Sequence, residues 1–279
     1  AYCISSVFGG SGLSSSAAFE TLVGVILNDL FGDNRLSAVT IARMGQKAEN
    51  DFFGKPSGLM DQMASSVGGI VAIDFEEPRD PKVDKLEIDF TKSGYALCII
   101  DSQSSHADLT GAYAGIPTEM NAVAGVFDRE HLRQMTMDEL IHKTGEVRRH
   151  CGDRAFLRAV HFLLENRRAQ DEARALDNGD FDRFLTLVSE SGRSSAMYLQ
   201  NTVVAGQVKD QAVNVVLALC DVLLAGKGAF RVHGGGFAGT VQAFVPLSEL
   251  EAFKRQMEGA VGPGCCHVLT IRPVGGAVI

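Results

Sequence analysis

The stretch from about residue 104 to 225 has the pattern of a series of helices and separates two groups of predicted strands. Apolar runs before and after it predict strands at 2–7, 68–75, 85–90, 95–101, 229–233, 239–245 and 267–273. The sequence predicts further helices at 14–31, 36–50, 59–66 and 249–258. A doubly wound parallel sheet requires regular alternation of strand and helix. This order lacks it, so the sequence predicts the α+β class.

The length and composition indicate one or two soluble domains. The chain has 279 residues, of which 46% are hydrophobic, enough for one large core or two smaller ones. A boundary near Ser93 falls between two strand groups, and we therefore predict domains at 1–93 and 94–279. The formal charge is −8 and the basic residues are scattered, so we expect no nucleic-acid or membrane partner. No apolar run approaches the roughly 20 residues that a membrane-spanning helix needs.

The six cysteines follow no metal-binding or disulfide pattern. They include no CxxC pair and no spacing typical of a zinc site. Cys98 and Cys220 lie in the apolar runs ALCII and LALCDVLLA, where we expect buried free thiols. Free thiols without a signal peptide are typical of a reducing compartment, so the sequence predicts a cytoplasmic protein.

The segment FGGSGLSSSAAFE, residues 8–20, places three glycines directly before three serines and a helix. This helix is apolar on nearly every face, so we expect it to be buried. Glycine lets the backbone approach a ligand closely, and a helix that begins there carries about half a positive charge at its N-terminus. Such a segment suits a phosphate group, and serine hydroxyls can bind phosphate oxygens or a magnesium ion. The alternative is an ordinary helix N-cap, for which one serine suffices. The segment contains no Walker-loop lysine.

Asp61 lies in a second segment, residues 48–69, where glycine and proline indicate a loop before a short helix. Its sequence neighbours are largely apolar, so we expect restricted hydration of its carboxylate. This environment is typical of a general base that takes a proton from a substrate hydroxyl. Glu49, earlier in the same segment, could complete a magnesium site. The alternative role for Asp61 is capping of the short helix.

The segment RVHGGGFAGTV, residues 231–241, is the third glycine-rich stretch. It satisfies the GxGxxG pattern, but a dinucleotide site requires a helix next, whereas TVQAFV predicts a strand. The sequence also lacks the HRD and DFG motifs of protein kinases. Two interpretations remain: a tight hairpin, or a backbone surface that lies against a ligand or the first glycine segment. His161, in an apolar helix, is predicted to be a packed histidine.

These three segments, in this order, resemble motifs of the GHMP superfamily, which includes galactokinases, homoserine kinases, mevalonate kinases and phosphomevalonate kinases. GSGLSSSAA resembles its phosphate-binding loop, and HGGGFAG resembles its C-terminal glycine motif. GLMDQM, DSQSSHADLTGAY and GDFDRFLTLVSESGRSS are similar to segments of galactokinases specifically. The resemblance implies a sugar kinase that depends on ATP and Mg²⁺. It also implies a two-domain fold whose C-terminal domain is ferredoxin-like α+β with a helical block.

The resemblance further implies roles for individual residues. Asp61 would orient or deprotonate the C1 hydroxyl of galactose, and Gly58 and Tyr113 would contact the sugar. Ser15 and Glu49 would bind Mg²⁺. The residues that would hold the ATP phosphates are Gly10, Ser11, Gly12, Leu13, Ser14, Ser15 and Ser16. The residues that would support this phosphate loop are Gly234, Gly235 and Gly236.

The sequence departs from the family pattern in three places, and only the last of them removes chemical groups. Phe8 stands where the family usually has proline, and Ala238 replaces a usual glycine. The N-terminal family signature contains an Arg that helps neutralise the transferring phosphoryl group and a Gly-Glu-His-Thr-Asp run that binds the sugar. Neither feature occurs in this sequence. We therefore expect an incomplete N-terminal domain, taken from a longer protein, and poor catalysis by these 279 residues.

The resemblance leaves two alternatives to galactokinase activity open. One is a kinase of the same superfamily for another sugar, such as N-acetylgalactosamine or arabinose. The other is a sensor that binds the sugar and ATP and signals to a protein partner without catalysis. In each case we expect a small-molecule sugar and ATP as ligands, and a monomer or weak homo-oligomer.

Overall fold

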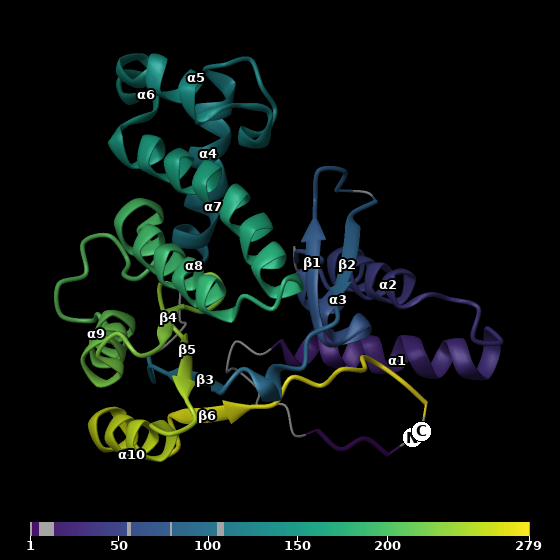
Figure 1. The fold of residues 1–279 in the computed structure, drawn as a ribbon. Helices are drawn as coiled ribbons and strands as arrows, with labels where there is room; N and C mark the ends of the chain where they lie inside the picture. The colour runs from purple at the N-terminus through teal and green to yellow at the C-terminus, as the bar shows by residue number, and fades with distance from the viewer. Residues whose placement is uncertain (1, 6–13, 55–56, 79, 105–108, 279) are drawn as a thin grey trace. The chain divides into compact units, whose positions relative to one another are not determined.

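The computed structural model describes residues 2–5, 14–54, 57–78, 80–104 and 109–278. Its contacts divide the chain into two compact units, residues 1–90 with 270–279, and residues 91–269. Both units combine helices and antiparallel strands, so the α+β prediction is confirmed (Figure 1). The units differ from the predicted domains at 1–93 and 94–279, because the last ten residues lie with the first unit. Whether the units are separate domains stays a prediction.

The first unit consists of three helices, a β-hairpin and the C-terminal segment. Its elements are α1 (Ser15–Phe31), α2 (Ala38–Asp51), α3 (Met60–Val67), β1 (Ile70–Asp74) and β2 (Lys82–Leu86). A 3₁₀ turn, η1 (Phe90–Lys92), follows β2. The three helices pack against one another around Ala42, Leu59 and Met63. The side chain of Ser37 accepts a hydrogen bond from the backbone N–H of Thr40 and caps α2, which begins two residues after the predicted position 36.

The C-terminal segment lies against the end of α3. The N–H of Gly69 donates to the carbonyl oxygen of Arg272 at 2.8 Å, and Lys85 Nζ donates to the carbonyl oxygen of Pro273 at 2.6 Å. Gly68 has a φ of 71°, and a Cβ there would lie 2.3 Å from the backbone nitrogen of Gly275. Only glycine permits this combination of left-handed backbone and close approach.

Two predictions for the start of the chain are wrong. Residues 2–5 form no strand, and the remainder of the strand predicted at 2–7 lies outside the described residues. The prediction of a fully buried first helix also fails, because one face of α1 is exposed. Its buried residues are Ala17, Thr21, Val25 and Asn28. Its exposed apolar residues are Phe19, Leu22, Val23, Ile26, Leu27, Leu30 and Phe31, and α2 and α3 cover only the opposite face.

The second unit is built on a four-stranded antiparallel sheet in the order β4-β5-β3-β6. The strands are β3 (Tyr95–Asp101), β4 (Ala229–Val232), β5 (Thr240–Pro246) and β6 (Cys266–Leu269). Alternate residues of β5 face opposite sides of the sheet. Ala243 and Val245 join a core with α9 (Ala212–Leu224) and α10 (Leu250–Val261). Phe244 instead contacts Phe184 of α8 (Phe181–Ser194), so helices cover both faces.

Helices make up the rest of the second unit, between β3 and β4. They are α4 (Thr110–Gly125), η2 (Leu132–Gln134), α5 (Met137–His142), α6 (Thr144–Cys151), α7 (Asp153–Asp177), α8 and the π-helical turn η3 (Ser195–Leu199). The long α7 packs beside α8 and α4 (Figure 1). Cys98 and Cys220 are fully buried free thiols, as predicted. None of the helices in the described ranges is long and apolar enough to span a membrane.

The two methionines of α3 provide a matched test of packing in the first unit. Met63 is fully buried and Met60 is 58% exposed. We expect Met63→Ala to lower the free energy of unfolding by about 2–5 kcal/mol, because it leaves a cavity in the core. Met60→Ala should change it by less than about 0.5 kcal/mol. Urea unfolding monitored by circular dichroism measures both, and equal effects would contradict this placement of the core.

Candidate functional site

Ser14 joins the N-terminus of α1 to Asp61 on α3. Its backbone is left-handed, with φ 52° and ψ 55°, and its side chain makes no capping hydrogen bond to α1. The hydroxyl instead donates to Asp61 Oδ2 at 2.5 Å. The capping alternative is therefore wrong for Ser14. The other loop residues predicted to bind phosphate, Gly10, Ser11, Gly12 and Leu13, lie outside the described residues.

Asp61 lies in the first turn of α3 and is exposed. The prediction of restricted hydration is therefore wrong. The reason is that the helix turns Leu59 and Met63 into the core, while Met60 and Asp61 face outward. Gly58, just before the helix, is also exposed, and a Cβ there would meet no atom within 4 Å. Open space surrounds this glycine on the side that a Cβ would occupy.

Glu49 of α2 is 5% exposed and is bonded by two other helices. Its Oε1 accepts a hydrogen bond from Ser16 Oγ at 3.2 Å, and its Oε2 accepts one from Gln62 Nε2 at 3.0 Å. Gln62 Nε2 also donates to Glu20 Oε2 at 3.1 Å. The sequence analysis missed Gln62 and Glu20. The signal for Gln62 was its place directly after Asp61 in the GLMDQM segment.

The predicted magnesium ligands are only partly brought together. Ser16, rather than Ser15, contacts Glu49, and the Ser15 hydroxyl has no partner among the described residues. Hydroxyl and carboxylate oxygens are the donors that Mg²⁺ prefers, so this set fits the ion chemically. The described residues contain no group of three or more His, Cys, Asp or Glu side chains that could hold a metal. A magnesium ion here would therefore keep water or nucleotide oxygens as further ligands.

In the second unit, Tyr113 of α4 lies against the third glycine segment. Its hydroxyl donates to the carbonyl oxygen of Gly236 at 2.9 Å, and its ring meets the edge of Phe237 at a centroid distance of 5.4 Å. A Cβ at Gly235 would lie 2.6 Å from the Tyr113 ring, so a larger residue does not fit. Asn201 holds the loop from the other side, because its Nδ2 donates to the carbonyl oxygen of Gly235 at 3.1 Å. Burial raises the pKa of Tyr113, which keeps the phenol a donor.

The third glycine segment forms the turn between β4 and β5. The N–H of His233 donates to the carbonyl oxygen of Thr240 at 2.9 Å, and Gly234 and Gly236 have φ values of 66° and 80°. Ala238, which departs from the family pattern, is buried. A tight hairpin is thus present and it supports Tyr113. Support of the phosphate loop by this segment stays a prediction, because the two belong to different units.

The sequence was compared with known protein families and with curated proteins. The sequence model of the family described as GHMP kinases N terminal domain matches residues 2–69, which include both Ser14 and Asp61. This match and the curated relatives support a relationship to the GHMP kinase superfamily. Within it, the galactokinase of Actinobacillus pleuropneumoniae is 31% identical over 249 residues, which cover 88% of this chain and 61% of that protein. The galactokinase of Haemophilus influenzae strain PittGG is 30% identical with the same coverage. This chain thus spans about three fifths of the length of these curated relatives.

Solved structures extend the similarity beyond the residues that the family model matches. The structure of Lactococcus lactis galactokinase complexed with galactose has a TM-score of 0.76 and 26% identity, and the match covers 96% of this chain and 68% of that chain. L. major mevalonate kinase in complex with R-mevalonate has a TM-score of 0.57 at 12% identity, which shows a similar fold alone. Both matches cover almost all of this chain and about two thirds of each matched chain, so this chain has the fold of that part of the two kinases.

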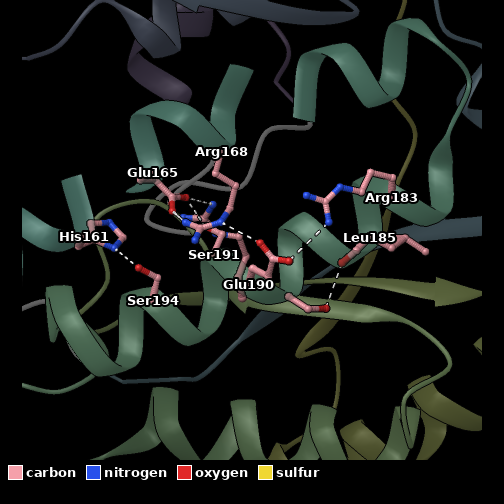
Figure 2. A network of polar contacts seen from close by, with 10 residues as sticks. His161, Glu165, Arg168, Arg183, Leu185, Glu190, Ser191 and Ser194 are labelled. Carbon is pink, nitrogen blue, oxygen red and sulfur yellow. Dashed lines mark hydrogen bonds and ion pairs between the residues drawn. The ribbon is translucent and has the colours of Figure 1, made fainter. Parts of the chain in front are cut away.

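A polar cluster that the sequence analysis did not predict lies between α7, α8 and β4 of this GHMP kinase fold (Figure 2). Glu165 is its centre and accepts hydrogen bonds from Ser191 and Arg168. Arg231 Nη1 approaches the same carboxylate at 3.3 Å. Arg168 Nε also lies 3.7 Å from Glu190. Each partner comes from a different turn or element, so no short sequence motif could have indicated the cluster.

His161 and Glu172 are the titratable groups at the edges of this cluster. His161 is 6% exposed and its Nδ1 lies 2.9 Å from Ser194 Oγ, which confirms the predicted packed histidine. Burial lowers the pKa of His161, so the imidazole is held neutral. Glu172 Oε1 is buried without a hydrogen-bond partner among the described residues. Burial raises the pKa of Glu172 to about 7, although Arg231 and Arg168 oppose the shift.

Glu172 therefore makes stability depend on pH. Its pKa is raised from 4.5 to about 7, so the folded state keeps this proton where the unfolded state has lost it. The contribution of Glu172 to stability falls as the pH rises through this window. We expect Glu172→Gln to raise the free energy of unfolding by about 1–3 kcal/mol at pH 8 and by less than about 1 kcal/mol at pH 5.

Urea unfolding at the two pH values measures this difference. The exposed Glu77→Gln, outside the helices and strands, is the matched control and should have no effect at either pH. The same gain from Glu172→Gln at pH 5 and pH 8 would show that the proton is not involved.

Proposed function

We propose that this chain is the nucleotide- and sugar-binding part of an ATP-dependent kinase that phosphorylates the C1 hydroxyl of galactose. The observation that carries the proposal is the contact between Ser14 and Asp61. It joins the N-terminus of the helix expected to bind phosphate to the carboxylate expected to act on the sugar. The similarity to galactokinases, one of them solved with galactose, supports this choice of substrate.

The residues of α1 would bind the nucleotide. The N-terminus of a helix attracts anions through its dipole and its N–H groups, and here the Ser14 side chain does not cap it. Ser15 and Ser16 would add hydroxyl donors to the ATP phosphates. Ser15 and Glu49 would hold Mg²⁺, which neutralises charge on the transferring phosphoryl group. The glycine loop before Ser14 would supply further backbone donors.

Asp61 would orient the sugar hydroxyl and accept its proton. Its carboxylate needs only hydrogen-bond reach of the substrate to do so, and its exposure on α3 leaves it accessible. Gly58 would let the sugar approach the backbone beside it. Tyr113 would contact the sugar from the second unit, held by its bond to Gly236.

The activity assay separates this function from the alternatives. Galactose-dependent ADP release is measured against glucose, N-acetylgalactosamine and arabinose at fixed ATP. Preference for galactose supports the proposal, and preference for another sugar of the panel favours the related kinase. Binding of both ATP and galactose by calorimetry, with no ADP released even by a chain extended upstream, favours the non-catalytic sensor.

The substitution Asp61→Asn tests the role of the carboxylate. In a chain extended upstream, we expect galactose-dependent ADP release to fall by about 100-fold or more, because the amide cannot accept the proton. ATP affinity, measured by calorimetry, should stay unchanged. The matched control is Asp84→Asn on β2, which removes only a surface pair with Lys82. Retained turnover in Asp61→Asn would remove this residue from the proposed role.

The substitution Ser15→Ala tests the metal site. The hydroxyl of Ser15 has no protein partner in the described chain, so its loss should leave the fold intact. Mg²⁺ should increase the affinity for ATP in both proteins. We expect this increase to be about tenfold smaller in the variant than in the unmodified chain. Binding of ATP in EDTA should differ much less between the two, because only one hydroxyl donor to the phosphates is then lost. Ser65→Ala on α3 is the control, and an identical Mg²⁺ effect in Ser15→Ala would exclude Ser15 as a ligand.

A further inference from the structure

A cavity of about 340 Å³ lies within the second unit, between α4, α7 and the segment that follows η3. This volume is in the range of small-molecule sites. Much of its wall is apolar, from residues such as Ala112, Val203 and Phe237. The polar side chains in the wall are Arg154, Arg158, Gln200 and Thr202. An apolar wall with a few polar groups is typical of sites that bind small organic molecules.

Arg158 is the most unusual group in this wall, because its side chain is only 3% exposed. Its Nε donates to the carbonyl oxygen of Leu199 at 3.1 Å, and its Nη1 donates to Glu119 Oε2 at 3.0 Å. Nη2 has no partner among the described residues. Nη2 is not among the fully buried unpaired atoms, so this unused donor is open to a molecule in the cavity that Arg158 lines.

The group formed by Arg154, Arg158 and Glu119 carries more positive than negative charge. Arg154 Nη2 and Nε both donate to the same carboxylate, Glu119. Two guanidinium groups therefore share one carboxylate, and one positive charge is left at the edge of the cavity. Burial lowers the pKa of Arg158, which reflects this cost, but arginine stays charged at any physiological pH. An anion in the cavity would complete the cluster.

Thr202 supplies a second, independent sign of a ligand. It is 5% exposed and lines the cavity, yet its hydroxyl has no hydrogen-bond partner among the described residues. The hydroxyl oxygen itself is not among the fully buried unpaired atoms, so it is open to a molecule in the cavity that Thr202 lines. A ligand that accepts hydrogen bonds from both Arg158 and Thr202 would satisfy both groups.

The cavity is separate from the proposed sugar contact at Tyr113. Gly111 and Gly115 of α4 line the cavity, and residues four apart share one face of a helix. Tyr113 lies between them in sequence and so points to the other side of α4. Phe237 is the link between the two places, since it lines the cavity and also packs against the Tyr113 ring.

We infer that this cavity binds a small organic anion, with a carboxylate or phosphate monoester at Arg158 and Thr202 and an apolar body against Phe237. Both anionic groups match the planar donors of a guanidinium. The inference does not depend on the proposed kinase activity. It concerns the second unit alone, where the residues that would bind ATP phosphates are not found.

Calorimetry with three probes tests the inference: phenyl phosphate, benzoate and the neutral benzyl alcohol. Saturating ATP and Mg²⁺ are present, so that the proposed phosphate loop cannot bind the probes. We expect at least one of the two anions to bind more tightly than benzyl alcohol by about tenfold or more. The stronger of the two identifies the anionic group. Equal or absent binding of all three probes would overturn the inference.

Two variants locate the binding. Gly111→Leu fills the cavity, because a Cβ at Gly111 meets no atom within 4 Å, and it should abolish binding of the anion. The same change at the exposed Gly125 of α4 is the matched control and should leave binding intact. Thr202→Val keeps the shape of the side chain and should weaken the anion severalfold without affecting benzyl alcohol. Unchanged anion binding in Gly111→Leu or in Thr202→Val would overturn the assignment.

Discussion

The side-chain amide of Gln62 connects all three helices of the first unit. It lies on α3 and donates to Glu20 on α1 and to Glu49 on α2. Gln62 and Glu49 are almost fully buried, and a buried carboxylate that loses a donor is costly. The three helices are therefore held at one spacing. Asp61 adjoins Gln62 on α3, so this spacing also sets the distance between Ser14 and Asp61.

The local parts of this site could be predicted from the sequence. The helices α1, α2 and α3, the last of which carries Asp61, could be predicted from rules that act within a few residues. Their chemistry could be predicted too, because hydroxyls and carboxylates near a helix N-terminus suit phosphate and Mg²⁺. The resemblance to GHMP kinases joined these separate segments, which no single motif could do.

The parts that could not be predicted depend on residues far apart in the chain. Gln62 reaches across 42 positions to Glu20, and Tyr113 reaches across 123 to Gly236. The exposed face of α1 could not be predicted either. An apolar pattern indicates that a helix face can be buried, but it does not indicate which element covers that face. Apolar neighbours in sequence likewise did not bury Asp61, since a helix separates adjacent residues by about 100°.

Two buried polar clusters of the helical block meet the cost of burial in different ways. Glu172 can take up a proton, and its pKa of about 7 shows that it loses its charge near neutral pH. Arg158 has no such route, because a guanidinium does not release its proton in proteins. Glu119 already serves Arg154 as well, so the remaining positive charge needs a partner from outside the cluster. The open space beside Arg158 is thus best explained as room for that partner, whereas Glu172, which can neutralise itself, needs none.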